Sequence, residues 1–204
     1  MLRSFLKLPA LFTLALTASA GPRIVLVGDS TVNDGGGWGY GFRQFVTEDV
    51  SVINTAQNGR SSKSFRDEGP WDQALAEKGD YYLIQFGHND QPGKGKARET
   101  DPATTYPENL ARFVDEVRAQ GGQPVLVTSL TRRTFSKKEP GRIESTLTPW
   151  ADAVKRVAAE KKVPVIDLHT LSIAYCEKLG PERTASLNFP EPSGKLDTTH
   201  LQGD

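Results

Sequence analysis

The sequence predicts an α/β protein: a three-layer α/β/α sandwich with a five-stranded parallel sheet. Three observations lead to this prediction. Short apolar runs recur along the 204-residue chain, segments with helical periodicity lie between them, and polar loops containing glycine follow three of the runs. Strands that alternate with helices form parallel βαβ units, whose right-handed crossovers place helices on both faces of the sheet. No internal repeat or linker interrupts the pattern, which predicts a single domain over residues 21–204.

The first strand is the clearest of the five. Residues 24–27 read Ile-Val-Leu-Val, an uninterrupted apolar run that is rich in β-branched residues. Such a run is typical of a strand buried on both faces. The remaining strands are expected at residues 51–54, 81–86, 124–128 and 163–167.

Helices are expected between the strands. Trp38, Phe42, Phe45 and Val46 recur at helical spacing and predict a helix lying on the sheet. Further helices are expected at residues 71–78, ended by a left-handed Gly79, at residues 107–120, ended by Gly121, and from Thr148 onward. The inward faces of the last two are predicted to be Leu110, Phe113, Val114 and Val117, and Trp150, Val154, Val157 and Ala158.

The first twenty residues are expected to be a secretory signal peptide. Arg3 and Lys7 give a positive start, an apolar stretch follows from Leu8 to Leu16, and Ala18-Ser19-Ala20 is a small-residue cleavage pattern. This predicts a secreted or periplasmic protein without a membrane anchor. Cleavage removes two of the 25 basic residues and none of the 25 acidic ones, which leaves a net charge of −2. That balance does not favour a nucleic-acid partner.

The C-terminal stretch, residues 187–204, carries Asp197-Thr198-Thr199-His200 and shows no helical pattern. A parallel sheet normally closes with a helix packed over its last strand. We therefore expect the domain to lack its C-terminal helix.

Three of the strand ends point to nucleophilic catalysis. Ser30, Gly59 and Asn89 follow the first three strands, at the edge where open α/β sheets bind ligands. A serine nucleophile needs a base and a group that orients this base. Asp197 and His200 can supply the pair on a helical turn or tight loop, with one imidazole nitrogen facing Ser30. The backbone N–H groups of Ser30 and Gly59 and the amide of Asn89 would stabilise an oxyanion, at about 3 kcal/mol per donor.

Four blocks of the sequence resemble a known family. In chain order they are Gly28-Asp29-Ser30, the loop around Gly59, Gly87-His88-Asn89-Asp90 and Asp197-x-x-His200, and they resemble the blocks of the SGNH (GDSL-like) hydrolases. The stretches Gly-Asp-Ser-Thr, Gly-Gly-Trp-Gly and Asn-x-Ala-x-Asn-Gly-Arg-Ser-Ser most resemble the rhamnogalacturonan acetylesterases. The resemblance implies a flavodoxin-like sandwich that needs no cofactor and no metal.

The resemblance also implies a role for each matching residue. Ser30 is then the nucleophile, His200 the base and Asp197 its orienting partner, while Ser30, Gly59 and Asn89 form the oxyanion hole. The sequence thus predicts an exported, monomeric serine esterase that removes O-acetyl groups from a plant cell-wall polysaccharide such as rhamnogalacturonan.

Two other functions stay open at this point. A lysophospholipase or thioesterase of the same superfamily would need an apolar trough for its acyl chain. A non-catalytic, flavodoxin-like binding module would leave the pair of Asp197 and His200 unexplained.

The candidate residues also have structural interpretations. Asp197 and His200 could be a surface pair near a frayed terminus. Asn89 could be a turn residue, Trp38 could pack the first helix or stack on a sugar, and His88 is expected to shape the end of the third strand.

Basic residues gather in the loops after the second and fourth strands, and by default they are solvated. A polyanionic pectin backbone would offer them carboxylates to bind. They are Arg60, Lys63 and Arg66 in the first loop and Arg132, Arg133, Lys137, Lys138 and Arg142 in the second.

Overall fold

The structure is a computed structural model that describes residues 21–190 and 194–202. The expected signal peptide, residues 1–20, lies outside the described residues. Five strands form one parallel sheet in the order β2-β1-β3-β4-β5, which is the flavodoxin-like order. The strands are β1 (Arg23–Gly28), β2 (Ser51–Asn54), β3 (Tyr81–Gln85), β4 (Gln123–Val127) and β5 (Val165–Ile166).

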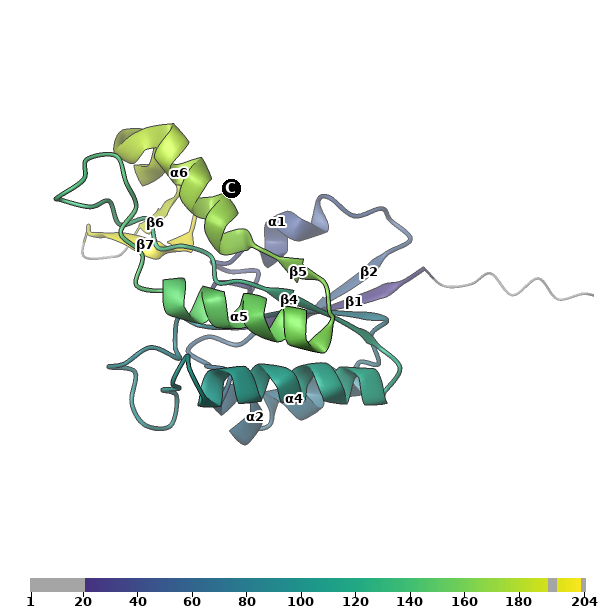
Figure 1. The fold of residues 1–204 in the computed structure, drawn as a ribbon. Coiled ribbons are helices and arrows are strands. Elements are labelled where there is room, and N and C mark those ends of the chain that lie inside the picture. Colours follow the sequence, from purple (N-terminus) through teal and green to yellow (C-terminus); the bar gives the residue numbers. More distant parts are fainter. Residues whose placement is uncertain (1–20, 191–193, 203–204) are drawn as a thin grey trace, which may run out of the picture.

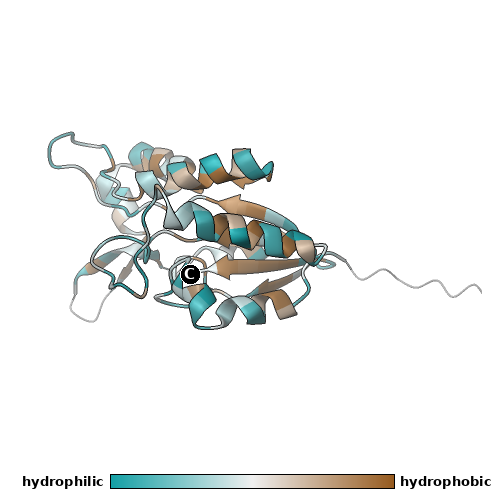
Figure 2. Cartoon of the chain, turned by 60° about the horizontal axis from the view of Figure 1, so that its bottom comes forward, coloured by the Kyte–Doolittle hydropathy of each residue, from teal (hydrophilic) through white to brown (hydrophobic). Residues whose placement is uncertain are grey.

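Helices cover both faces of the sheet, so the predicted three-layer α/β/α sandwich is confirmed (Figure 1). One face carries α2 (Ser64–Asp67), α3 (Pro70–Ala76), α4 (Thr105–Ala119) and α5 (Thr148–Lys161). The other face carries α1 (Gly39–Arg43) and the start of α6 (Leu168–Ala185). Figure 2 shows the strands as hydrophobic ribbons between helices that present polar residues outward.

The larger part of the core lies under α3, α4 and α5. Alternate β1 residues, Val25 and Val27, face it, while Leu26 faces the opposite layer. Trp71 packs edge-on against Phe113 with ring centroids 4.6 Å apart. The predicted inward faces of α4 and α5 are confirmed, since all of their members are buried: Leu110, Phe113, Val114 and Val117, and Trp150, Val154, Val157 and Ala158.

The first helix is shorter than the sequence predicts. It ends at Arg43, and Phe45, expected to face the sheet, is 89% exposed. Glycine occupies two of its five positions, and glycine disfavours helix propagation by about 1 kcal/mol relative to alanine. Trp38 and Phe42 do pack together against the sheet, with ring centroids 5.9 Å apart.

The ends of α3 and α4 differ in how they use glycine. The left-handed residue after α3 is Lys78, with φ 51°, and the prediction that Gly79 takes this role is wrong. Gly79 serves packing instead, because a Cβ there would lie 2.6 Å from the Cγ2 atom of Val25. Gly121 does follow the end of α4, as predicted, and it adopts a left-handed conformation with φ 86°.

The sequence does not predict the elements after β5. That strand is only two residues long, and α6 follows it at once, with Asp167 accepting a hydrogen bond from the Thr170 backbone. Then β6 (Asn188–Pro190) and β7 (Leu196–Leu201) pair antiparallel beyond the carboxyl ends of the sheet strands (Figure 1). No helix within the described residues is long and apolar enough to span a membrane.

Candidate active site

The turn after β1 holds the candidate nucleophile at the carboxyl edge of the sheet. The Oδ1 atom of Asp29 accepts hydrogen bonds from the backbone N–H of Thr31, at 2.9 Å, and from its hydroxyl, at 2.7 Å. The backbone carbonyl of Asp29 also accepts from the N–H of Val32. Asp29 thus fixes a tight turn from both its side chain and its backbone, and this turn carries Ser30.

A buried chain of hydrogen bonds connects this turn to the neighbouring strand β3. Gln85, on β3, donates to the Thr31 hydroxyl at 2.7 Å and accepts from the indole N–H of Trp38 at 2.9 Å. Trp38 therefore packs α1 and holds the network, which is the first of its two sequence interpretations. Burial raises the pKa of Asp29, although its hydrogen bonds with Thr31 oppose that rise.

The structure brings Ser30, His200 and Asp197 together. The Nε2 atom of His200 lies 2.7 Å from the Ser30 hydroxyl oxygen, and its Nδ1 atom lies 2.5 Å from Oδ2 of Asp197. Asp197 and His200, the candidate acid–base pair, lie on β7, which differs from the helical turn or loop expected from the sequence. A cavity of about 340 Å³ opens over the three residues.

Asp197 is held as a carboxylate by its hydrogen bonds. Its Oδ1 atom accepts from the backbone N–H of Thr199 at 2.7 Å and of His200 at 3.2 Å. Burial by itself raises the pKa of Asp197, but the bonds from His200 and from these two N–H groups outweigh burial, so the pKa is lowered. A carboxylate in this position can orient the imidazole and stabilise its protonated form.

Arg133 anchors the strand that carries the pair. Its guanidinium donates to the carbonyl of His200 and, at 2.6 Å, to the side-chain oxygen of Asn188. The backbone N–H of Arg133 donates to the carbonyl of Thr198. The expectation that Arg133 is solvated is wrong, since only 5% of it is exposed. The sequence offers no signal for this role because the partners lie more than 50 residues away.

The other expected oxyanion donors lie on the loops after β2 and β3. Gly59 has a left-handed φ of 75°, which favours glycine. The Asn89 amide donates to the carbonyl of Arg60 at 3.1 Å, which joins the two loops. The lining of the cavity includes Ser30 and Asn58 but neither Gly59 nor Asn89.

Asp90 links the same two loops from inside. It is fully buried and accepts hydrogen bonds from the Ser62 hydroxyl at 2.6 Å and from the Thr100 hydroxyl at 2.9 Å. The backbone N–H of Ser62 donates to it as well. Burial raises the pKa of Asp90 to about 7, against the effect of these hydrogen bonds. In the sequence, the position of Asp90 directly after Asn89 is the signal that it belongs near the candidate site.

His88 has the structural place that the sequence suggests. Only 3% of the residue is exposed, and its Nδ1 atom lies 3.8 Å from Oδ2 of Asp29. Burial holds the pKa of His88 well below its usual value, so the imidazole is neutral. Within the described residues, no cluster of three or more histidine, cysteine or acidic side chains could hold a metal ion.

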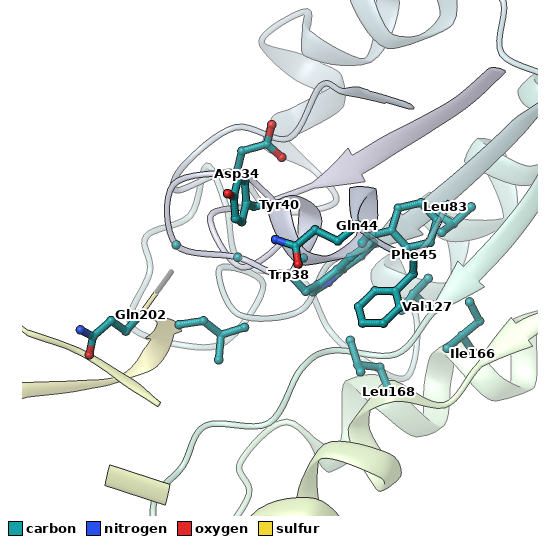
Figure 3. A pocket seen from close by; sticks show the side chains of 15 residues that line it. Asp34, Trp38, Tyr40, Gln44, Phe45, Leu83, Val127, Ile166, Leu168 and Gln202 are labelled. Atoms are coloured by element: carbon teal, nitrogen blue, oxygen red, sulfur yellow. The ribbon is translucent and has the colours of Figure 1, made fainter. Parts of the chain in front are cut away.

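A second, larger cavity of about 540 Å³ lies on the α1 face of the sheet (Figure 3). Its walls are mostly apolar and include Trp38, Phe45, Leu83, Val127 and Leu168. It shares Gly36 with the cavity over Ser30, but none of the three candidate catalytic residues lines it.

The fold and the site define a class of protein that the comparisons also find. The chain belongs to the GDSL-like Lipase/Acylhydrolase family, whose model matches residues 20–186. This stretch contains Ser30, Gly59 and Asn89, while Asp197 and His200 lie beyond it.

Particular relatives narrow the family to one branch. Rhamnogalacturonan acetylesterase RhgT of Bacillus subtilis is 43% identical over 199 residues, covering 88% of this chain and 82% of the relative. Rhamnogalacturonan acetylesterase of Emericella nidulans is 42% identical over 228 residues, covering 98% and 86%. The resemblance to the rhamnogalacturonan acetylesterase-like branch of the SGNH hydrolases is thus confirmed.

Solved structures agree on the fold. YxiM of Bacillus subtilis superposes with a TM-score of 0.75 at 30% identity, and the match covers 89% of this chain but 51% of that protein. Axe2, an acetylxylan esterase of Geobacillus stearothermophilus, gives a TM-score of 0.63 at 19% identity over 80% of this chain and 83% of Axe2. The latter likeness is one of fold.

Proposed function

We propose that this protein is a serine acetylesterase that removes O-acetyl groups from rhamnogalacturonan-type pectin. The observation that carries the proposal is that His200 lies between Ser30 and Asp197 within hydrogen-bonding distance of both. Its Nε2 atom is 2.7 Å from the Ser30 hydroxyl oxygen, and its Nδ1 atom is 2.5 Å from Oδ2 of Asp197. The names of the relatives from Bacillus subtilis and Emericella nidulans support the choice of substrate.

The reaction begins when Ser30 attacks the acetyl carbonyl carbon. The Nε2 atom of His200 takes the hydroxyl proton as the new C–O bond forms, and Asp197 stabilises the resulting imidazolium. The tetrahedral intermediate then expels the sugar oxygen, which receives that proton from His200. In the second half, His200 activates a water molecule that attacks the acetyl-enzyme, releasing acetate and restoring the Ser30 hydroxyl.

The oxyanion of both intermediates needs donors that are in place beforehand. We assign this role to the backbone N–H groups of Ser30 and Gly59 and to the side-chain amide of Asn89. The bond from Asn89 to the carbonyl of Arg60 uses one of its two amide hydrogens, and within the described residues the other is left as a donor for the oxyanion. Loss of one such donor typically lowers kcat by about 10² to 10³.

Export belongs to the same proposal, because a pectin substrate lies outside the cell that makes the enzyme. The segment expected to direct export, residues 1–20, is outside the described structure. Cell fractionation with and without these residues tests the prediction. Retention of the full chain in the cytoplasm would contradict it.

Acetate release tests the function directly. The wild-type protein and its Ser30→Ala variant are incubated with acetylated rhamnogalacturonan, acetylated xylan and p-nitrophenyl acetate. We expect release to require Ser30 and to be faster from the pectic polymer than from xylan. Ser186→Ala, on an exposed residue just after α6, is the matched control and should behave as wild type.

The same assay separates the alternatives. A preference for long-chain p-nitrophenyl esters over the acetate would favour a lipolytic esterase. Release that does not depend on Ser30 would overturn the proposed mechanism. Saccharide binding with no ester hydrolysis at all would favour a binding module.

A further inference from the structure

The cavity over Ser30 has walls that the proposed reaction does not use. Besides the three candidate catalytic residues, its lining contains Phe189 and Pro190 from β6, and Asn33 and Asn58 from the loops after β1 and β2. These side chains surround the point where the acetyl ester must sit, so they will contact whatever group bears the ester.

Among the described residues, Phe189 is the one phenylalanine, tyrosine or tryptophan in this lining. It is 38% exposed, although a phenylalanine ring is normally buried. Its strand pairs antiparallel with β7, and the register places Phe189 opposite Asp197. The ring and the acid–base pair therefore share one two-stranded unit, which fixes the ring relative to His200. An aromatic surface held open inside a reaction cavity is typical of a ligand-binding surface.

Asn33 and Asn58 give the same cavity hydrogen-bonding groups. The Asn33 amide donates to the side-chain oxygen of Asn58 and accepts from the backbone N–H of Gly35 at 3.0 Å. The amide nitrogen of Asn58 has no hydrogen-bond partner within the described residues, and the residue is exposed. Its two N–H groups are therefore available to a ligand, and the bond to Asn33 fixes the orientation of the amide.

An apolar platform together with amide donors matches the chemistry of a pyranose ring. Such a ring has a face of C–H groups that stacks on aromatic surfaces and a rim of hydroxyl groups that accept hydrogen bonds. An alkyl chain would use the platform but would leave the amide donors without partners, and burial of unpaired donors is costly.

We propose that Phe189 is the stacking platform for the sugar that carries the acetyl group, with the Asn58 amide donating to a hydroxyl of that sugar. The proposal deepens the proposed function and rests on it for the identity of the ester. It makes Phe189 a specificity-determining residue: the ring discriminates a saccharide ester from a small ester, while the chemical step is left to Ser30 and His200.

Kinetics on two esters test the platform. Phe189→Ala, Phe189→Trp and the control Leu196→Ala are compared on an acetylated rhamnogalacturonan oligosaccharide and on p-nitrophenyl acetate. Leu196 is 44% exposed on the same hairpin and outside the cavity lining, so it reports any general loosening of the hairpin.

We expect Phe189→Ala to lower the ratio of kcat/KM for the oligosaccharide to kcat/KM for p-nitrophenyl acetate about tenfold, mainly through KM. Phe189→Trp should keep the ratio, and Leu196→Ala should change neither activity. An equal loss on both esters would show a structural role and overturn the proposal. A new activity on longer acyl chains in Phe189→Ala would also overturn it, because the ring would then be a wall of the acyl pocket.

Binding without turnover separates this inference from the proposed function. Calorimetry measures the deacetylated oligosaccharide against Ser30→Ala and against Ser30→Ala combined with Phe189→Ala. Binding that weakens about tenfold in the double variant supports the platform even if no acetate is ever released. Equal binding by both variants, or no binding by either, would overturn the platform, and acetate release by the wild type would still uphold the proposed function.

Discussion

Replacing Asp197 with asparagine tests the proposed mechanism at its most sensitive point. In the structure, Oδ2 of Asp197 lies against Nδ1 of His200, and Nε2 faces the Ser30 hydroxyl. The proposed mechanism needs the imidazole proton on Nδ1, so that Nε2 can accept the proton of Ser30. The Oδ1 atom of Asp197 meanwhile accepts two backbone N–H groups, those of Thr199 and His200. An asparagine has one oxygen, and the two backbone donors will hold it. Its amide group then faces Nδ1 and donates to it.

That donor forces the imidazole proton onto Nε2, the wrong nitrogen for a base that must accept from Ser30. In serine hydrolases with this arrangement, the same change lowers kcat by about 10⁴, or about 5 kcal/mol of transition-state stabilisation. Stability should change little, because the backbone bonds of Oδ1 are kept. We therefore expect a large loss of kcat on p-nitrophenyl acetate with a nearly unchanged Tm.

Asp167→Asn is the matched control for this experiment. Asp167 is also a carboxylate that accepts from a nearby backbone N–H, at the start of α6, but it lies outside the site. Its variant should keep wild-type activity. A loss of less than about tenfold in Asp197→Asn, with the fold intact by circular dichroism, would refute the assignment of Asp197 as the orienting group.

Four further predictions concern single residues. Asn89→Ala should lower kcat on p-nitrophenyl acetate by about 10² to 10³, and an unchanged kcat would remove Asn89 from the oxyanion hole. Gly59→Ala should cost about 1 to 2 kcal/mol in urea unfolding, because its φ of 75° disfavours a Cβ, and equal stability would contradict this. Phe45→Ser should leave stability within about 0.5 kcal/mol, since the ring is 89% exposed, and a larger loss would mean that the ring is packed. Burial raises the pKa of Asp90 from 3.8 to about 7, so the native state holds a proton that the unfolded chain has lost, and stability falls as pH rises through that window. The free energy of unfolding of wild type relative to Asp90→Asn should therefore drop by up to about 4 kcal/mol between those pH values, whereas parallel pH profiles would contradict the shift.

The sequence predicts best what local patterns determine. The apolar run of β1 is buried on both faces because helices lie over both faces of the sheet. On α4, Phe113 and Val117 form a stripe on one side of the helix because only that side packs against the core. Ser30, Gly59 and Asn89 could be placed at strand ends because the carboxyl ends of parallel strands share one edge. For these positions, the relevant physical determinant lies within a few residues along the chain.

The failures have the opposite origin. The apolar residues of α6 form no clear stripe along one face, so the periodicity of the sequence does not indicate a helix there. Two of these residues, Leu171 and Tyr175, are more than half exposed in the structure. Arg133 and Asp90 are charged residues with buried side chains, and only their distant partners explain this. Phe45 has helical spacing, but α1, in which two of five residues are glycine, ends at Arg43 and does not include it. The spacing of apolar residues along the chain shows neither which of them stay exposed in the fold nor which charged residues find hydrogen-bond partners far away in the sequence.

The candidate site combines both kinds of determinant. Ser30 sits on a turn fixed by its own neighbours, whereas His200 is 170 residues away on a strand outside the main sheet. That strand is tied back by Arg133 and by the N–H of Leu201, which donates to the carbonyl of Gly36 at 2.8 Å. Gly36 belongs to the loop after the Ser30 turn, and a Cβ at this position would lie 3.4 Å from the Cβ atom of His200. The loop that follows the Ser30 turn thus lines the cavity beside Ser30 and is hydrogen-bonded to the strand that carries His200, so it helps to hold the candidate nucleophile and its candidate base close together.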